Sequence, residues 1–278
     1  MEQALFEDGY SDILKKAMFG LGIGEAAAST RTGVEPSVIR NLLGGASNPD
    51  QNALTALAGL LGLSPEKLVK FALNADLPRN VAIPPTLEIM ASESSNCANT
   101  YIFRCQTSGA SFIVDPGANA GGVAAMAKKD GAKPGGIILT HGHSDHTGAA
   151  LDLSIALNVP IMVLDREKEE LAGASRVSFV APGYAFKSAP FIVRFLHVPG
   201  HTAGHAVIVV QGAGYAFTGD ALFARSVGYA SESGKAYSTL LSGVREKVLG
   251  LPWDTILCPG HGPITTVADE KALNPFFV

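Results

Sequence analysis

Apolar residues recur at helical spacing over the first quarter of the chain and at strand spacing beyond it. The first pattern predicts five short helices without a strand, at residues 11–19, 24–30, 36–43, 52–61 and 65–73. Residues 76–85 contain three prolines and no periodicity, which is typical of a linker. We therefore expect a small all-α domain over residues 1–75, a linker over 76–85 and a second domain over 86–278.

In the second domain, short β-rich runs alternate with helical segments. Runs typical of strands lie at residues 86–90, 100–105, 111–115, 136–140, 160–164, 191–197, 206–210, 215–218 and 255–258. Helical patterns lie at residues 120–129, 149–157, 166–171 and 239–249. So many strands with helices between them predict a layered α/β architecture.

Composition and charge narrow the possible classes of protein. The 278 residues are 47% apolar, which is enough for a sizeable core, and the net charge of −4 gives no reason to expect an anionic partner. The first residues are acidic and no apolar run is long enough to span a bilayer, so we expect a cytoplasmic protein without a membrane partner. Cys97, Cys105 and Cys258 lack metal-site spacing and suit a reducing compartment.

Potential metal ligands are concentrated in four glycine-flanked loops, each of which follows an apolar run. The seven candidates are His141, His143, Asp145, His146, His201, Asp220 and His261. One catalytic zinc takes three protein ligands and a water, so seven ligands favour two ions. Asp220 stands alone in its loop, and its two oxygens could bridge the ions. Paired ions with a hydroxide between them would support metal-assisted hydrolysis of a carbonyl compound.

The spacing His-x-His-x-Asp-His at 141–146, together with Ile113-Val114-Asp115-Pro116-Gly117, resembles the metallo-β-lactamase fold superfamily over residues 84–278. This resemblance implies a four-layer αββα sandwich with two divalent metal ions, zinc above all, with iron or manganese as alternatives. It implies a first metal on His141, His143 and His201, a second on Asp145, His146 and His261, a bridging Asp220, and an Asp115 that supports a ligand histidine.

Three further segments resemble the short glyoxalase II type of hydrolase: residues 199–205, 219–228, and 259–263 followed by 274–276. That resemblance implies a small-molecule thioester or related ester, attacked by a metal-bridging hydroxide, with Asp145 and Asp220 as catalytic carboxylates. Tyr229 stands where relatives often have arginine, and the helical domain that carries basic glutathione contacts in longer relatives is missing. Arg225 and Tyr229 are candidate substrate contacts, and loop packing is an equal alternative for both.

Other functions stay open at this level. Persulfide dioxygenases share much of the pattern but use a single iron, which here would lie on His141, His201 and Asp220. A DNA-binding regulator, whose metallo-β-lactamase domain senses a ligand without turning it over, is a further alternative. His205 and His197 lie outside the ligand set, and we expect His205 to be structural.

The segment from Glu25 to Ser64 resembles a helix-turn-helix domain of the phage-repressor type. The resemblance implies DNA binding through the helix at 36–43, with Ser37, Arg40 and Asn41 facing the bases. Residues 1–75 hold six basic against eight acidic side chains, so neutralisation of phosphates would be weak. The alternative is a helical domain that serves docking or the formation of a homodimer.

Overall fold

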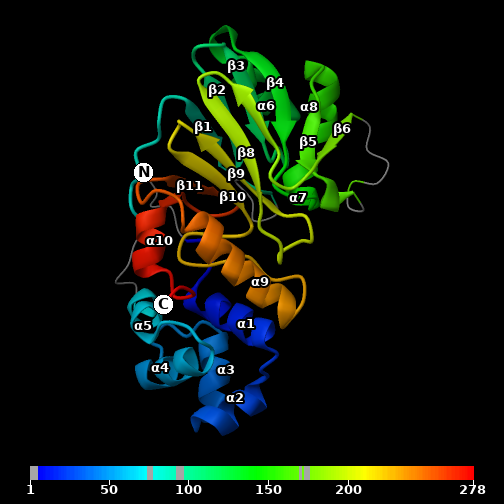
Figure 1. Cartoon of the computed structure of the whole chain (residues 1–278). Helices are drawn as coiled ribbons and strands as arrows, with labels where there is room; N and C mark the ends of the chain where they lie inside the picture. Colours follow the sequence, from blue (N-terminus) through cyan, green and yellow to red (C-terminus); the bar gives the residue numbers. More distant parts are fainter. Residues whose placement is uncertain (1–5, 74–77, 92–96, 169–170, 172–175) are drawn as a thin grey trace.

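Two six-stranded sheets pack face to face in the computed structural model, which describes residues 6–73, 78–91, 97–168, 171 and 176–278 (Figure 1). The first sheet runs in chain order through β1 (Leu87–Met90), β2 (Thr100–Cys105), β3 (Ala110–Val114), β4 (Lys133–Ile138), β5 (Ile161–Leu164) and β6 (Val177–Val180). The second sheet has the order β12 (Thr265–Thr266), β11 (Ile256–Pro259), β10 (Tyr215–Gly219), β9 (Ala206–Gln211), β8 (Phe191–His197) and β7 (Ala185–Ser188).

Strand direction decides where the ligand loops emerge. In the first sheet β1, β2 and β3 pair antiparallel, whereas β3, β4, β5 and β6 run parallel. In the second sheet β10 and β11 are parallel neighbours within an otherwise antiparallel arrangement. The loops after β4, β8, β10 and β11 carry the predicted ligands, so each ligand is held at the end of a paired strand.

Helices cover the outer faces of both sheets and complete four layers. On the first sheet lie α6 (Ala120–Ala127) and α8 (Ala150–Leu157), which pack on it through a buried cluster that includes Ile113 and Leu153. On the second lie α9 (Lys235–Gly243), extended by a π-turn at Val244–Val248, and α10 (Val267–Leu273) (Figure 1). Aromatic side chains such as Phe103, Phe195 and Phe217 fill the space between the sheets.

Five helices precede the sandwich: α1 (Tyr10–Leu21), α2 (Glu25–Thr32), α3 (Pro36–Leu43), α4 (Gln51–Leu60) and α5 (Pro65–Ala72). Their ends follow the local sequence. The side chain of Asp50 accepts hydrogen bonds from the first turn of α4, Ser64 caps α5 in the same way, and Gly22 and Gly33 end α1 and α2 in the left-handed conformation.

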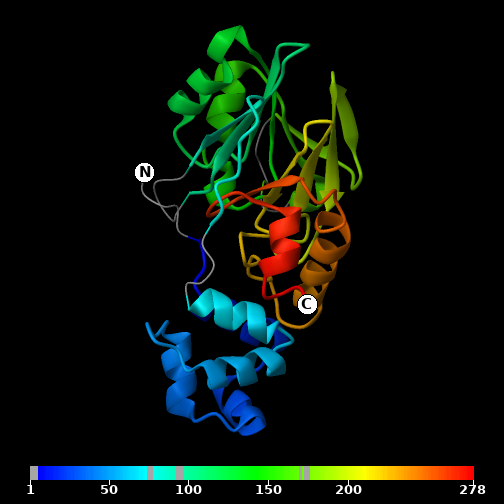
Figure 2. The same ribbon diagram turned by 90° about the vertical axis from the view of Figure 1, so that its left-hand side faces the viewer.

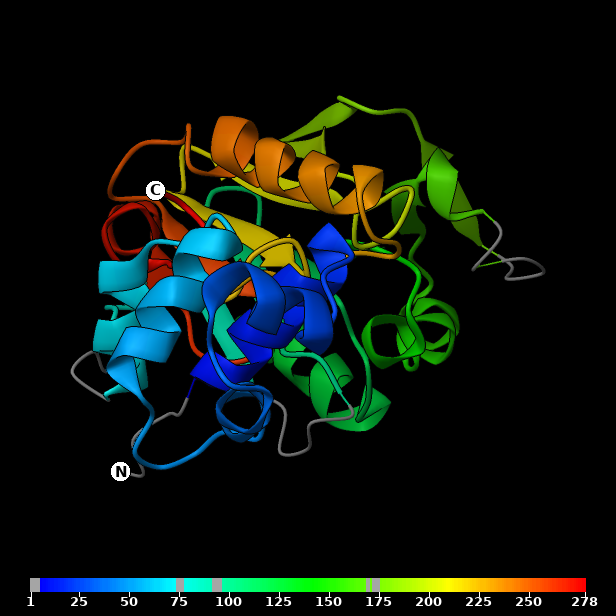
Figure 3. The same cartoon turned by 90° about the horizontal axis from the view of Figure 1, so that it is seen from below.

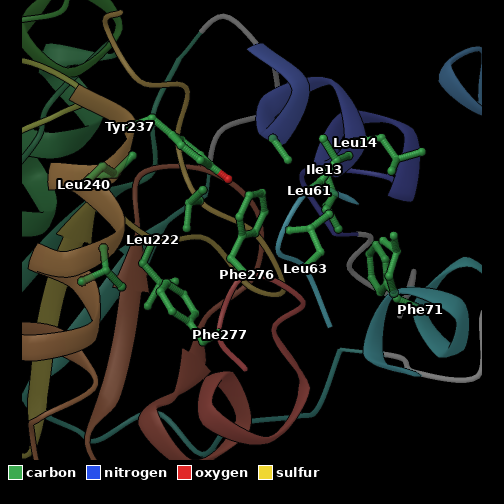
Figure 4. Packing of buried hydrophobic residues seen from close by; sticks show 14 of the residues in the cluster. Ile13, Leu14, Leu61, Leu63, Phe71, Leu222, Tyr237, Leu240, Phe276 and Phe277 are labelled. Atoms are coloured by element: carbon green, nitrogen blue, oxygen red, sulfur yellow. The ribbon is translucent and has the colours of Figure 1, made fainter. Parts of the chain in front are cut away.

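These helices share one hydrophobic cluster with the second sheet, α9 and the C-terminal residues. Figure 4 shows Ile13, Leu61 and Leu63 beside Leu222 and Phe276, all of them buried. Figures 1 and 2 show the five helices at one end of the sandwich, and Figure 3 views the molecule from that end. The helical region is therefore packed against the sandwich.

The predicted fold class is confirmed, and each predicted strand and each of the five N-terminal helices has a counterpart in the structure. Strands β6, β7 and β12 and helices α7 (Ser144–Thr147) and α10 are not among the predicted elements. The helix expected at 166–171 is a single 3₁₀ turn at Asp165–Glu167, although residues 169 and 170 lie outside the described part. Of the expected linker, residues 76 and 77 also lie outside, and residues 78–85 form neither helix nor strand. None of the helices in the described residues has the length and apolar character needed to span a bilayer.

Candidate metal centre

The four ligand loops meet between the two sheets. Their side chains form three groups, and within each group the potential ligand atoms lie within 4.8 Å of one another. The groups are His141, His143 and His201; His141, His146 and Asp220; and Asp145, His146 and His261. The structure thus brings all seven candidates predicted from the sequence into one site.

Asp220 lies between the other ligands. Its Oδ1 is 3.2 Å from His146 Nε2, and its Oδ2 is 3.5 Å from His201 Nε2 and 3.7 Å from His261 Nε2. On one side of it His201 Nε2 lies 3.1 Å from His143 Nδ1. On the other side His261 Nε2 lies 3.1 Å from Asp145 Oδ2. The two oxygens of one carboxylate therefore face both halves of the site.

The ligand atoms of the site fit divalent cations, because several of them are buried polar atoms without a hydrogen-bond partner among the described residues. Within the described chain, His141 Nε2, His146 Nε2 and Asp220 Oδ1 make no hydrogen bond. The last two atoms face each other at 3.2 Å, but without hydrogen-bond geometry. Buried polar atoms are normally satisfied, so three unpaired polar atoms that converge on one place fit a binding site for a cation. Imidazole nitrogens with carboxylate oxygens are ligands that zinc and related metals prefer.

The charges of the site also suit a cation. Burial together with the neighbouring His146 holds the pKa of His141 well below its ordinary value, so this imidazole is neutral and able to bind a metal. Burial alone would raise the pKa of Asp220, but the adjacent imidazole of His146 outweighs it and holds that pKa well below the ordinary range. Asp220 is therefore a charged carboxylate in a buried position, and its charge requires cationic partners.

Asp115, at the end of β3, orients the ligand histidines from behind. It accepts hydrogen bonds from Thr140 N (2.8 Å), Thr140 Oγ1 (2.7 Å) and His146 Nδ1 (3.0 Å), and Thr140 Oγ1 is 3.1 Å from His141 Nδ1. In a neutral imidazole, donation of Nδ1–H to a carboxylate leaves Nε2 without a proton and able to bind a metal. This is the supporting position expected for Asp115 from the sequence.

Two supporting residues have roles that sequence reasoning did not assign. Glu167, fully buried, accepts hydrogen bonds from Gly142 N (2.8 Å), Thr202 Oγ1 (2.5 Å) and Gly204 N (2.7 Å), and so joins the loops after β4 and β8. An acidic residue three positions after the buried strand β5 is the only signal in the sequence. His205 is the second of these supporting residues. The sequence predicts a structural role for it, and its Nε2 accepts a hydrogen bond from Asp220 N (3.0 Å).

Close backbone contacts at two glycines fix the loops. A Cβ atom on Gly117 would lie 1.7 Å from the carbonyl oxygen of Asp145, and one on Gly228 would lie 1.9 Å from that of Asp220. Neither position can accept a side chain without movement of a ligand-bearing loop. The glycine-rich loops are thus required by close packing around the site as well as by the turns themselves.

The predicted substrate contacts differ in position. Tyr229 is 46% exposed, and its carbonyl oxygen accepts a hydrogen bond from His201 Nδ1 (2.8 Å). Arg225 is 1% exposed, and its guanidinium pairs with the buried Glu270 (2.6 Å). The placement of Arg225 favours the loop-packing alternative, because a fully buried ion pair has no surface for a substrate.

The residues expected to contact DNA lie elsewhere. Ser37, Arg40 and Asn41 are all exposed on α3, at the end of the molecule away from the metal centre (Figure 1). Arg40 lies 3.9 Å from the carboxylate of Glu25 on α2, so part of its charge is balanced within the region.

Comparisons with known proteins agree with this site. The model of the metallo-beta-lactamase superfamily matches residues 98–261. A hydroxyacylglutathione hydrolase of Haemophilus influenzae, GloC, is 33% identical over 181 residues, which cover 59% of this chain and 85% of that protein. A probable metallo-hydrolase of Bacillus subtilis, YqgX, is 32% identical over 59% of this chain and 86% of its own length.

Among solved structures, TTHA1623 in a di-iron-bound form is 29% identical with a TM-score of 0.57, and the alignment covers 66% of this chain and 97% of that one. The superfamily match begins at residue 98, so helices α1 to α5 lie outside it. With its αββα sandwich and its cluster of histidine and aspartate ligands, the chain belongs to the metallo-beta-lactamase superfamily and is a metal-dependent hydrolase of that family.

Proposed function

We propose that the protein hydrolyses a thioester or a related ester with two divalent ions, zinc above all. The observation that carries this proposal is the pair of ligand groups on either side of Asp220. His141, His143 and His201 would hold one ion, Asp145, His146 and His261 the other, and Asp220 would bridge them. A pair of ions in this position supplies an activated water and polarises the carbonyl oxygen of the substrate.

The protein's own groups would set the geometry of that reaction. Asp115 holds the Nδ1 proton of His146, and Glu167 fixes the distance between the loops after β4 and β8. Asp145 is partly exposed at the site, with its carboxylate 3.1 Å from His261 and 3.7 Å from His146. In that position Asp145 is placed to bind a metal and to accept a hydrogen bond from the attacking water.

The choice of a thioester is supported by relatives rather than by a substrate pocket. The relative GloC is a hydroxyacylglutathione hydrolase, and it aligns with this chain over most of its own length. Tyr229 stands where related enzymes often have arginine. The identity of the thiol in the substrate is therefore tested with a panel of thioesters.

The test is release of thiol from a panel of acyl-glutathione and acyl-coenzyme A thioesters by protein loaded with zinc, manganese or iron. We expect turnover with at least one thioester, and loss of roughly 10²-fold or more in kcat for Asp220→Asn, because the bridging charge is removed. Asp254→Asn is the matched control, since Asp254 is exposed and precedes β11, whereas the ligand His261 follows the opposite end of that strand.

Absence of thiol release with every thioester and every metal would reject the proposal. Oxygen uptake with glutathione persulfide by the iron-loaded protein would assign the site to a dioxygenase reaction on His141, His201 and Asp220 instead. Elemental analysis of the purified protein distinguishes the two reactions independently. Two metal ions per chain are expected for the hydrolase and one iron for the dioxygenase.

A further inference from the structure

Lys16 of α1 is a buried cation at the boundary between the N-terminal helices and the metal centre. Its side chain is only 4% exposed, whereas the neighbouring Lys15 has 44% of its side chain exposed. Lys16 Nζ pairs with the carboxylate of Asp8 and donates a hydrogen bond to the carbonyl oxygen of Val227 (2.8 Å). Burial of a lysine is costly, so a lysine in this position needs these partners.

The same ammonium group lies over two aromatic rings. It is 4.9 Å from the centre of the Phe223 ring and 5.0 Å from that of Tyr229. Cation–π contacts of this length attract most strongly where the cation is shielded from water, and the side chain of Lys16 is buried. Lys16 therefore holds Phe223, Val227 and Tyr229, which are three points along the loop that follows the bridging candidate Asp220.

Two of these points contact metal ligands directly. The ring of Phe223 packs edge-on against the imidazole of His261, with 5.8 Å between ring centres. The carbonyl oxygen of Tyr229 accepts a hydrogen bond from His201 Nδ1 (2.8 Å). Lys16 is thus connected to His261 through Phe223 and to His201 through Tyr229, which are ligands in the two halves of the site.

The chain that leads into α1 makes a second contact with the ligand loops. The backbone of Glu7 packs on Gly262, where an added Cβ would lie 3.0 Å from Glu7 N and 2.9 Å from Glu7 Cβ. The ring of Phe6 lies 5.5 Å from the guanidinium carbon of Arg225. Gly262 directly follows the ligand His261, so the N-terminal segment supports the loop after β11 as well as the loop after β10.

We propose that the N-terminal helical region completes the metal centre, and that Lys16 is its positioning residue. The region lies outside the superfamily match, and yet it supports two of the ligand loops that the match contains. Lys16 touches neither substrate nor metal in this proposal. It fixes the positions of His201 and His261 by holding the loop from Phe223 to Tyr229, and so it sets the affinity of the site for metal and the rate of the reaction proposed above.

The test compares Lys16→Met with Lys15→Met, which removes an exposed lysine from the same helix. Zinc affinity is measured by competition with a chromophoric chelator, without any substrate. Loss of a group that supports metal ligands typically weakens metal affinity roughly 10–100-fold, and we expect a loss in this range for Lys16→Met and none for Lys15→Met. In turnover we expect a lower kcat with little change in KM, and Lys16→Arg, which keeps the charge, should recover most of both losses.

Equal zinc affinity for folded Lys16→Met and the wild-type protein would overturn the proposal. If Lys16→Met does not fold, Tyr229→Leu replaces it, because Tyr229 is half-exposed and its substitution removes one ring beneath the ammonium while the backbone carbonyl remains. Unchanged zinc affinity in Tyr229→Leu would then refute the proposal. A wild-type protein that binds zinc but cleaves no thioester would reject the proposed function alone, since the zinc measurement does not depend on it.

Discussion

Asp115 gives the sharpest test of how the ligand histidines are oriented. Its Oδ1 accepts a hydrogen bond from Thr140 N, and its Oδ2 accepts from Thr140 Oγ1 and His146 Nδ1. Asp115→Asn keeps the shape of the side chain but turns one acceptor oxygen into an NH₂ donor. In one orientation of the amide this NH₂ group faces the N–H of Thr140, and in the other it faces the Nδ1–H of His146. Either orientation therefore places two hydrogen-bond donors against each other, a conflict that the carboxylate of Asp115 avoids.

The size of the effect follows from these bonds. Hydrogen bonds to a charged group contribute about 1.5–3 kcal/mol each, so loss of one and weakening of the others predict a fall of roughly 3 kcal/mol in the free energy of unfolding of the metal-free protein. In the orientation that turns the NH₂ toward His146, the histidine relieves the conflict only by moving its proton to Nε2, the atom that would bind metal. We therefore expect zinc affinity to fall roughly 10–100-fold, equivalent to about 1.4–2.7 kcal/mol.

Urea unfolding in excess chelator gives the first quantity, and chelator competition for zinc gives the second. Asp152→Asn is the matched control, because Asp152 is an exposed carboxylate on α8. An Asp115→Asn protein with wild-type zinc affinity would refute the reasoning, since it would show that neither the charge of Asp115 nor its two acceptor oxygens matter to the ligand histidines.

Three other predictions concern stability and reactivity. Glu270→Gln removes the buried carboxylate charge that pairs with the guanidinium of Arg225, so we expect a loss of about 3–5 kcal/mol by urea unfolding; an unchanged midpoint would contradict this. Although burial opposes it, hydrogen bonds from two cations lower the pKa of Glu88 below 4.5, so Glu88→Gln should destabilise the protein at pH 7, with a difference in melting temperature that shrinks as pH falls below 4.5. Burial raises the pKa of the Cys258 thiol, and iodoacetamide should label the partly exposed Cys97 but not Cys258 in the native protein, as read by mass spectrometry.

The ligand set could be predicted from the sequence because its signal is local. His141, His143 and His146 stand together just after an apolar run, and the other ligands repeat the arrangement of strand, glycine and ligand. A strand end is where a sheet holds a side chain most rigidly, so the same local pattern in four loops indicated a common site. The topology then brings those strand ends together.

The supporting residues could not be predicted in this way, because their roles depend on partners far along the chain. Glu167 accepts hydrogen bonds from residues 142, 202 and 204, and no pattern near position 167 indicates them. Lys16 follows Ile13 and Leu14 on an amphipathic helix, where a lysine ordinarily faces water. Its burial results from a loop more than two hundred residues later. The missed strands β6 and β7 are sheet edges with half their residues exposed, which weakens the apolar alternation.

The contact of Lys16 with the loop from Phe223 to Tyr229 has a thermodynamic consequence for the exposed helices α2 and α3. Two sites joined through one packed body influence each other equally, because linkage is reciprocal. If metal binding orders that loop and thereby raises the affinity of the helical region for another molecule, then that molecule must strengthen metal binding by the same factor. Metal occupancy and occupancy of the α3 surface would then report on each other, even though the two surfaces lie at different ends of the molecule.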